Sequence, residues 1–143
     1  MKLIVETDHV GNVYHYKIVG KRRLTHNPYG PAILVKNTWT ARKEWQINGK
    51  RHRIGGPAIE WLDGDYDYYL KGKRHRVDGP AIVRFDHNRL APTRKDSIYW
   101  YINGNAYETE TAYLKAVTHW LSYKDVTRDE IQHLIGKFKI VEW

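Results

Sequence analysis

Two basic clusters hold the residue types in this chain that are best suited to binding. Lys50-Arg51-His52-Arg53 is followed, 23 residues further on, by Lys73-Arg74-His75-Arg76. Arg22 and Arg23 begin a weaker copy nearer the N-terminus. Guanidinium groups hold phosphate or carboxylate through paired hydrogen bonds, and a stripe of them attracts polyanions. We therefore expect an anion- or partner-binding surface here, with ordinary solvation of exposed turns by Lys and Arg as the competing interpretation.

Tyr69 and Tyr101 are the aromatic candidates for the same surface. They share one strand phase with Gln46, on the side expected to be exposed. Exposed rings can stack on bases or on a nucleotide ring. For the repeated aromatic residues as a group, however, the sequence favours packing in the core. Aromatic residues that recur on one side of alternating strands mainly indicate that this side is buried.

Histidines recur at one place in the clusters, as His52 and His75, and His26 is a candidate for the same place in the weaker copy. Stacked imidazoles can bind metal or transfer protons. A residue repeated in every unit is more typical of a structural device, here a hydrogen bond to a backbone carbonyl or to Asp78. We therefore predict no catalytic and no metal-binding residue. A small hydrolase or nuclease that uses these histidines is the least favoured alternative.

Composition excludes several classes of site. The 143 residues include no cysteine, so disulfide frameworks and thiolate metal sites are absent. No phosphate-binding loop or nucleophile elbow is present, and Asp63, Asp65 and Asp67 lack the glycine and closing glutamate of a calcium loop. We expect no cofactor. The formal net charge of +8, from 24 basic and 16 acidic residues, again points to anionic partners.

An internal repeat positions the basic clusters. Residues 49–59 and 72–82 agree at nine of eleven positions, and partial copies begin at Gly20 and Gly104. Each copy follows an aromatic and an aliphatic residue two positions apart, which places both on one side of a strand. These pairs define units one to four: Tyr16 and Ile18, Trp45 and Ile47, Tyr68 and Leu70, Trp100 and Ile102. Asn48-Gly49 and Asn103-Gly104 are typical hairpin turns.

The repeat predicts a mainly β fold with a small α portion, an antiparallel meander of hairpins with about seven or eight strands. Residues 1–107 form the array, and 108–143 form a helical cap within the same compact unit. The first expected helix carries five apolar residues on one stripe: Tyr113, Leu114, Val117, Trp120 and Leu121. A second begins at the capping box of Thr127, and a short final strand occupies residues 137–143.

The pattern aromatic-x-aliphatic-Asn-Gly-Lys-x-His-Arg-x-Asp-Gly-Pro-Ala resembles MORN-like hairpin repeats of small phage and bacterial proteins. The match covers residues 14–104 and departs from the pattern at Gly55 and in unit one. The resemblance implies a hairpin array and favours a phage-encoded protein. It implies no established activity.

We interpret the chain as a non-enzymatic interaction protein that engages a host protein or another anionic partner through its basic repeat face. The alternative is a protein that sequesters nucleic acid or a phosphorylated nucleotide. No apolar run approaches the length of a membrane span, so we expect no stable membrane insertion and a cytoplasmic location. The unpaired edges of a meander could also pair two copies into a homodimer.

Overall fold

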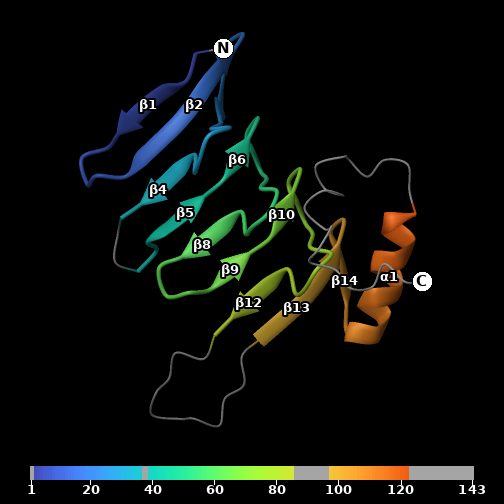
Figure 1. Cartoon of the computed structure of the whole chain (residues 1–143). Helices are drawn as coiled ribbons and strands as arrows, with labels where there is room; N and C mark the ends of the chain where they lie inside the picture. The colour runs from blue at the N-terminus through green and yellow to red at the C-terminus, as the bar shows by residue number, and fades with distance from the viewer. Residues whose placement is uncertain (1, 37–38, 86–96, 123–143) are drawn as a thin grey trace, which may run out of the picture.

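The structure is a computed structural model that describes residues 2–36, 39–85 and 97–122. Figure 1 shows a twisted antiparallel sheet that runs from the N-terminal hairpin to a helix packed at the opposite end. The predicted mainly β meander is therefore confirmed. The elements are β1 Ile4–Thr7, β2 Val13–Val19, β3 Arg22–Thr25, β4 Ile33–Val35, β5 Arg42–Glu44, β6 Gln46–Ile47, β7 Lys50–Arg51, β8 Ile59–Trp61, β9 Tyr66–Asp67, β10 Tyr69–Leu70, β11 Lys73–Arg74, β12 Ile82–Arg84, β13 Ser97–Ile102, β14 Asn105–Tyr107 and α1 Glu110–Leu121.

The main sheet has the strand order β1-β2-β4-β5-β8-β9-β12-β13-β14, with β3 paired to β2. The hairpins β6–β7 and β10–β11 form separate two-stranded sheets beside it. The described residues thus hold fourteen short strands rather than the seven or eight expected. The reason is a change of partner at the repeated aromatic residue: the Trp45 backbone donates to Ala58 at 2.7 Å and accepts from His52 at 3.1 Å.

The hairpin turns have the backbone conformation that their sequence predicts. Asn48 and Gly49 have φ values of 51° and 76°, and Asn103 and Gly104 have 47° and 81°. Two successive positive φ values define the type I′ turn, whose twist matches that of the strands. Lys71 adopts the same conformation, with φ 50°, at the position that asparagine occupies in these two turns.

The alanine of each Gly-Pro-Ala motif stands immediately before the strand β4, β8 or β12. Ala32, Ala58 and Ala81 are completely buried. Their backbones link neighbouring units, as where Ala81 donates to the Tyr99 carbonyl at 2.8 Å. A larger side chain would force the strands apart, since protein interiors have no spare volume.

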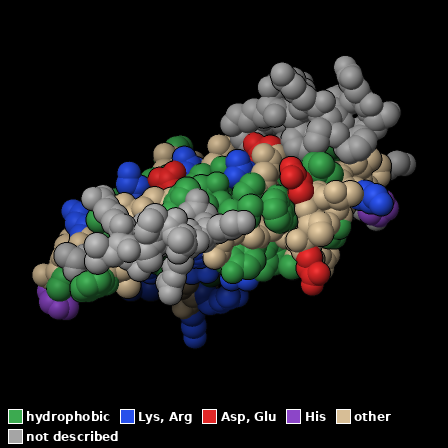
Figure 2. Space-filling view, turned by 90° about the horizontal axis from the view of Figure 1, so that it is seen from below, with side chains coloured by type: hydrophobic (Ala, Val, Ile, Leu, Met, Phe, Trp, Pro, Cys, Tyr) green, Lys and Arg blue, Asp and Glu red, His purple; other side chains and the backbone are tan. Residues whose placement is uncertain are grey.

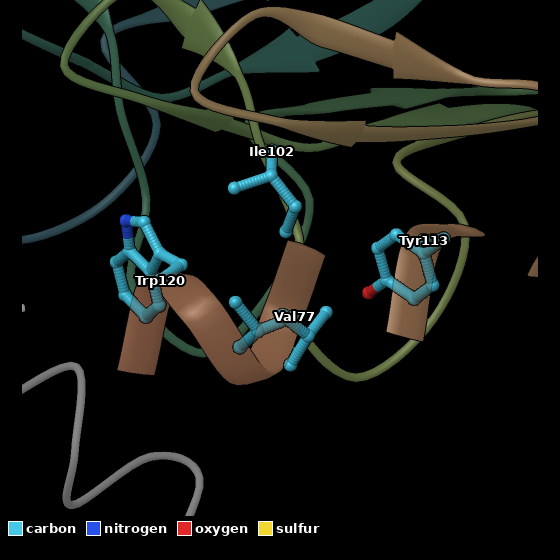
Figure 3. Packing of buried hydrophobic residues seen from close by; sticks show 5 residues of the cluster. Val77, Ile102, Tyr113 and Trp120 are labelled. Atoms are coloured by element: carbon cyan, nitrogen blue, oxygen red, sulfur yellow. The ribbon is translucent and has the colours of Figure 1, made fainter. Parts of the chain in front are cut away.

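Helix α1 covers the last units of the array. Thr109 caps it by accepting from the Ala112 backbone at 3.1 Å. Three residues of the predicted stripe, Tyr113, Val117 and Trp120, are buried and pack with Val77 and Ile102 (Figure 3). The other two, Leu114 and Leu121, are partly buried against this cluster. The predicted second helix at Thr127 and the final strand at 137–143 lie outside the described residues.

Candidate functional site

The two basic clusters lie side by side in register, as predicted. The Gly72 backbone donates to the Arg51 carbonyl at 2.8 Å, and the Arg53 backbone donates to the Tyr69 carbonyl at 3.2 Å. The next hairpin repeats the first of these bonds, from Gly104 to Arg74, also at 2.8 Å. Successive hairpins are therefore joined backbone to backbone, and equivalent side chains follow one another along the array.

Arg51 and Arg74 form one surface row with the two candidate tyrosines. The guanidinium carbon of Arg51 lies 5.4 Å from the Tyr69 ring centre, and that of Arg74 lies 5.4 Å from the Tyr101 ring centre. Arg74 Nε also donates to the Tyr69 hydroxyl at 3.3 Å. Both arginines are exposed, and both tyrosines are half-buried. We call Arg51, Tyr69, Arg74 and Tyr101 the Arg–Tyr ladder.

Arg53 has a different environment, because alternate residues of an extended segment point to opposite sides. Its guanidinium carbon lies 3.7 Å from the Trp45 ring centre, and Nη1 donates to the Pro57 carbonyl at 3.1 Å. Nη1 also pairs with Glu60 at 2.9 Å. The same guanidinium would lie only 2.9 Å from a Cβ at Gly56, which explains the glycine of the motif.

Arg76 repeats this arrangement one unit later. It lies over the Tyr68 ring at 4.1 Å, donates to the Pro80 carbonyl at 3.1 Å and pairs with Asp78 at 2.8 Å. The expectation that Arg53 and Arg76 join an open anion-binding stripe must therefore be corrected. Both guanidinium groups brace the Gly-Pro-Ala corner, and both have a carboxylate partner.

The repeated histidines also serve as connectors. His26, His52 and His75 each accept through Nδ1 from the first turn residue of the next hairpin, at 2.9, 2.9 and 3.0 Å. The donors are the backbone nitrogens of Asn48, Lys71 and Asn103. His26 is thus equivalent to the other two. The predicted partner was a carbonyl or Asp78; the imidazole instead accepts from a backbone N–H.

This geometry places the imidazole proton on Nε2, since Nδ1 is the acceptor. In His75 that Nε2 is buried without a hydrogen-bond partner, and the ring centre lies 4.6 Å from that of Trp120. Burial lowers the pKa of His75 to about 4. Burial, followed by the charge of Lys17, also lowers the pKa of His26. Among the described residues, no group of three His, Asp or Glu side chains could hold a metal ion.

Two buried carboxylates were not identified from the sequence. Glu44 accepts from Arg51 Nε at 2.8 Å and from Arg42 Nε at 3.1 Å. Asp67 accepts from both terminal nitrogens of Arg84, at 2.6 and 2.9 Å. Each acid immediately precedes the aromatic residue of its unit, which is the signal that could have revealed them. Glu44 offsets the charge of Arg51 and fixes that end of the ladder.

The remaining candidates occupy different places. Arg23 lies over the Tyr16 ring at 4.0 Å and pairs with Glu6 at 2.7 Å, at the N-terminal end of the array, and Arg22 is exposed on the same strand. Lys50 and Lys73 are exposed beside the turns of Gly72 and Gly104.

No ion pair in the described part of the chain involves Lys50, Lys71, Lys73 or Arg74. In Figure 2, a group of basic side chains gathers at the lower edge of the view, others stand separately along the upper edge, and hydrophobic side chains lie between them. Trp39, in the connection between β4 and β5, has 93% of its surface exposed.

No family model matches this chain, and no curated protein or solved structure shows significant similarity to it. None of the described helices is long and apolar enough to cross a membrane.

Proposed function

We propose that this chain is a non-enzymatic binding protein that holds an acidic segment of a partner protein against the Arg–Tyr ladder. The observation that carries this proposal is the alternation of exposed guanidinium groups with tyrosine rings across successive hairpins. If the chain is phage-encoded, as the repeat pattern favours, the partner is a host protein.

The ladder presents donors in excess of acceptors. Arg74 uses Nε on Tyr69, and its guanidinium group also interacts with the Tyr101 hydroxyl, but it has no carboxylate partner among the described residues. Tyr69 accepts that bond, so its own O–H is available to donate outward. Lys50, Lys71 and Lys73 add ammonium donors along the same turns. A complementary ligand must supply acceptors with negative charge, and carboxylate side chains meet both requirements.

An acidic protein segment fits this surface better than a nucleic acid. The rings of Tyr69 and Tyr101 each already have a guanidinium group over them, from Arg51 and Arg74. Binding of single strands depends on aromatic faces that are open for base stacking. The occupied rings therefore favour recognition by hydrogen bonds and charge. Sequestration of nucleic acid or a phosphorylated nucleotide is the competing outcome of the test.

The test compares an oligoglutamate peptide with an oligothymidylate of equal charge, both fluorescently labelled, across a salt titration. We expect the peptide to bind, and K73S/R74S to weaken it by about tenfold or more, since charge-assisted bonds contribute about 1.5–3 kcal/mol each. The matched control K21S/R22S removes the same charge from the first hairpin and should change affinity by less than about twofold. Tighter binding of oligothymidylate with a steep salt dependence would replace this function with nucleic-acid binding. Equal effects of both double variants would show that net charge alone is responsible.

A further inference from the structure

Successive hairpins meet at three equivalent junctions along the array. At each junction a histidine accepts from the first residue of the next turn, and a second side chain lies 3.4 to 3.8 Å from where a Cβ on the turn glycine would stand. These two side chains and the first turn residue are Leu24, His26 and Asn48 at the first junction, Lys50, His52 and Lys71 at the second, and Lys73, His75 and Asn103 at the third. Of the three junctions, only the second has two lysines.

The second junction, between the β6–β7 and β10–β11 hairpins (Figure 1), contains an open pocket of about 360 Å³. We call it the two-lysine pocket, and its lining residues are Ile47, Asn48, Lys50, His52 and Lys71. The Lys50 stem lies against the turn, with its Cβ 3.5 Å from where a Cβ of Gly72 would stand, and the Lys71 backbone donates to His52. Neither lysine takes part in an ion pair within the described part of the chain. The pocket therefore holds two positive charges that no described carboxylate offsets.

The backbone of Lys71 is an independent sign that this junction has a special role. Its φ of 50° lies in the left-handed region, which asparagine and glycine tolerate far better than lysine. The equivalent residues Asn48 and Asn103 have nearly the same φ, so the array uses the favoured residue at the other two junctions. Backbone strain of this kind is concentrated at binding sites. The strained lysine and the open pocket occur at the same junction.

We propose that the two-lysine pocket binds the dianionic phosphate group of a phosphate monoester. Two ammonium groups match the two negative charges of this group, whereas a single carboxylate would leave one ammonium uncompensated. The side-chain amide of Asn48 can donate to a further phosphate oxygen. Ile47 provides an apolar wall for the organic part of the ligand.

The two-lysine pocket is separate from the Arg–Tyr ladder. Lys50 pairs with Ile47 across its hairpin, whereas Arg51 pairs with Gln46. Paired residues of a hairpin share a face and successive residues alternate, so the pocket and the ladder begin on opposite faces of the hairpin. The inference therefore does not depend on the ligand of the ladder.

The probe is phenyl phosphate, titrated into the isotope-labelled full chain while backbone amide shifts are followed by NMR. We expect the amides of Asn48 and Lys71 to shift, and K50L and K71N, which install the residues of the first junction, each to weaken binding by about fivefold or more. Benzoate, which has the same ring and a single charge, should bind at least about fivefold more weakly. K21L is the matched control, because Lys21 is an exposed lysine in the turn of the first hairpin, and it should change the affinity by less than about twofold.

K71N provides a second readout, because relief of the left-handed strain should raise the melting temperature by about 2 °C while phosphate affinity falls. A melting temperature that does not rise in K71N, equal binding of benzoate and phenyl phosphate, or equal losses in K21L and K50L would overturn the proposal. A capped glycine–phosphotyrosine–glycine peptide separates two sources of the phosphate monoester. Tighter binding of this peptide than of phenyl phosphate assigns the pocket to a phosphorylated protein side chain, and equal or weaker binding assigns it to a small molecule.

Discussion

His75 Nδ1 lies 3.0 Å from the backbone nitrogen of Asn103 and accepts its hydrogen, so that one imidazole joins two successive hairpins. The same bond joins His26 to Asn48 and His52 to Lys71. The bond gives the backbone N–H of the first turn residue an acceptor that the pairing of the strands does not supply. Each histidine thus sets the position of the following hairpin, and with it the alignment of the Arg–Tyr ladder.

Removal of this connector should destabilise the fold. H75A leaves the Asn103 N–H without its acceptor and a void beside Trp120, so we expect a loss of about 1–3 kcal/mol in the free energy of unfolding. Urea denaturation followed by tryptophan fluorescence measures it. H9A, at an exposed histidine in the connection between β1 and β2, should change the free energy of unfolding by less than about 0.5 kcal/mol. A loss in H75A no larger than that of H9A would refute the connector role.

Stability should fall as the solution becomes acidic, and the buried imidazole sets the range of pH. His75 has a folded-state pKa of about 4 against 6.5 when solvated, so the unfolded chain binds its proton more readily. This contribution is complete above pH 6.5 and is lost as the pH falls towards 4, for a total of about 3 kcal/mol. Unfolding free energies between pH 7 and 4.5 should decline less steeply in H75N. Parallel slopes for wild type and H75N would contradict the assignment.

Gly56 of the Gly-Pro-Ala motif should be required for stability only because the Arg53 guanidinium group lies against it. A Cβ at Gly56 would lie 2.9 Å from the guanidinium carbon and displace it from Trp45. We expect G56A to lower the free energy of unfolding by about 1 kcal/mol in the wild-type background and by nearly nothing in the R53A background. The two substitutions should therefore be non-additive in a double-mutant cycle. Chemical denaturation of the four proteins provides the measurement. Equal costs in both backgrounds would mean that the backbone, and not the guanidinium group, requires glycine.

The repeated tryptophans should differ in their contribution to stability. Trp100 packs against the core under α1, with its ring centre 6.3 Å from that of Tyr113. Trp45 lies between the Arg53 guanidinium group and an open recess. W100A should therefore cost about 3–5 kcal/mol, and W45A about half as much. Thermal unfolding compares them, and a W45A cost equal to that of W100A would place Trp45 in a closed core.

The sequence predicted those features that are set by local geometry or by the repeat itself. The hairpin turns at Asn48-Gly49 and Asn103-Gly104, the in-register stacking of the basic clusters and the buried stripe of Tyr113, Val117 and Trp120 are all present. It did not separate the exposed from the bracing arginines, because the cluster was interpreted by charge rather than by strand phase.

The carboxylates that hold the arginines were harder to predict. Glu44 reaches Arg51 across a hairpin, and Asp67 reaches Arg84 from a neighbouring strand. These pairs depend on a register that the sequence pattern does not specify. The break of each long strand at Trp45 or Tyr68 has the same origin, since it requires knowledge of which neighbour receives each backbone bond.

The central claim is that Arg51 and Arg74 bind the partner, whereas Arg53 and Arg76, two positions later in each unit, stabilise the fold. The most direct measurement compares R51S/R74S with R53S/R76S for oligoglutamate affinity and melting temperature. Arg51 pairs with the buried carboxylate of Glu44, which keeps Arg42 as its second partner. We therefore predict that R51S/R74S loses about tenfold or more in affinity and lowers the melting temperature by less than R53S/R76S, which melts roughly 5 °C or more below wild type. Unchanged affinity in R51S/R74S, or an unchanged melting temperature in R53S/R76S, would contradict the claim.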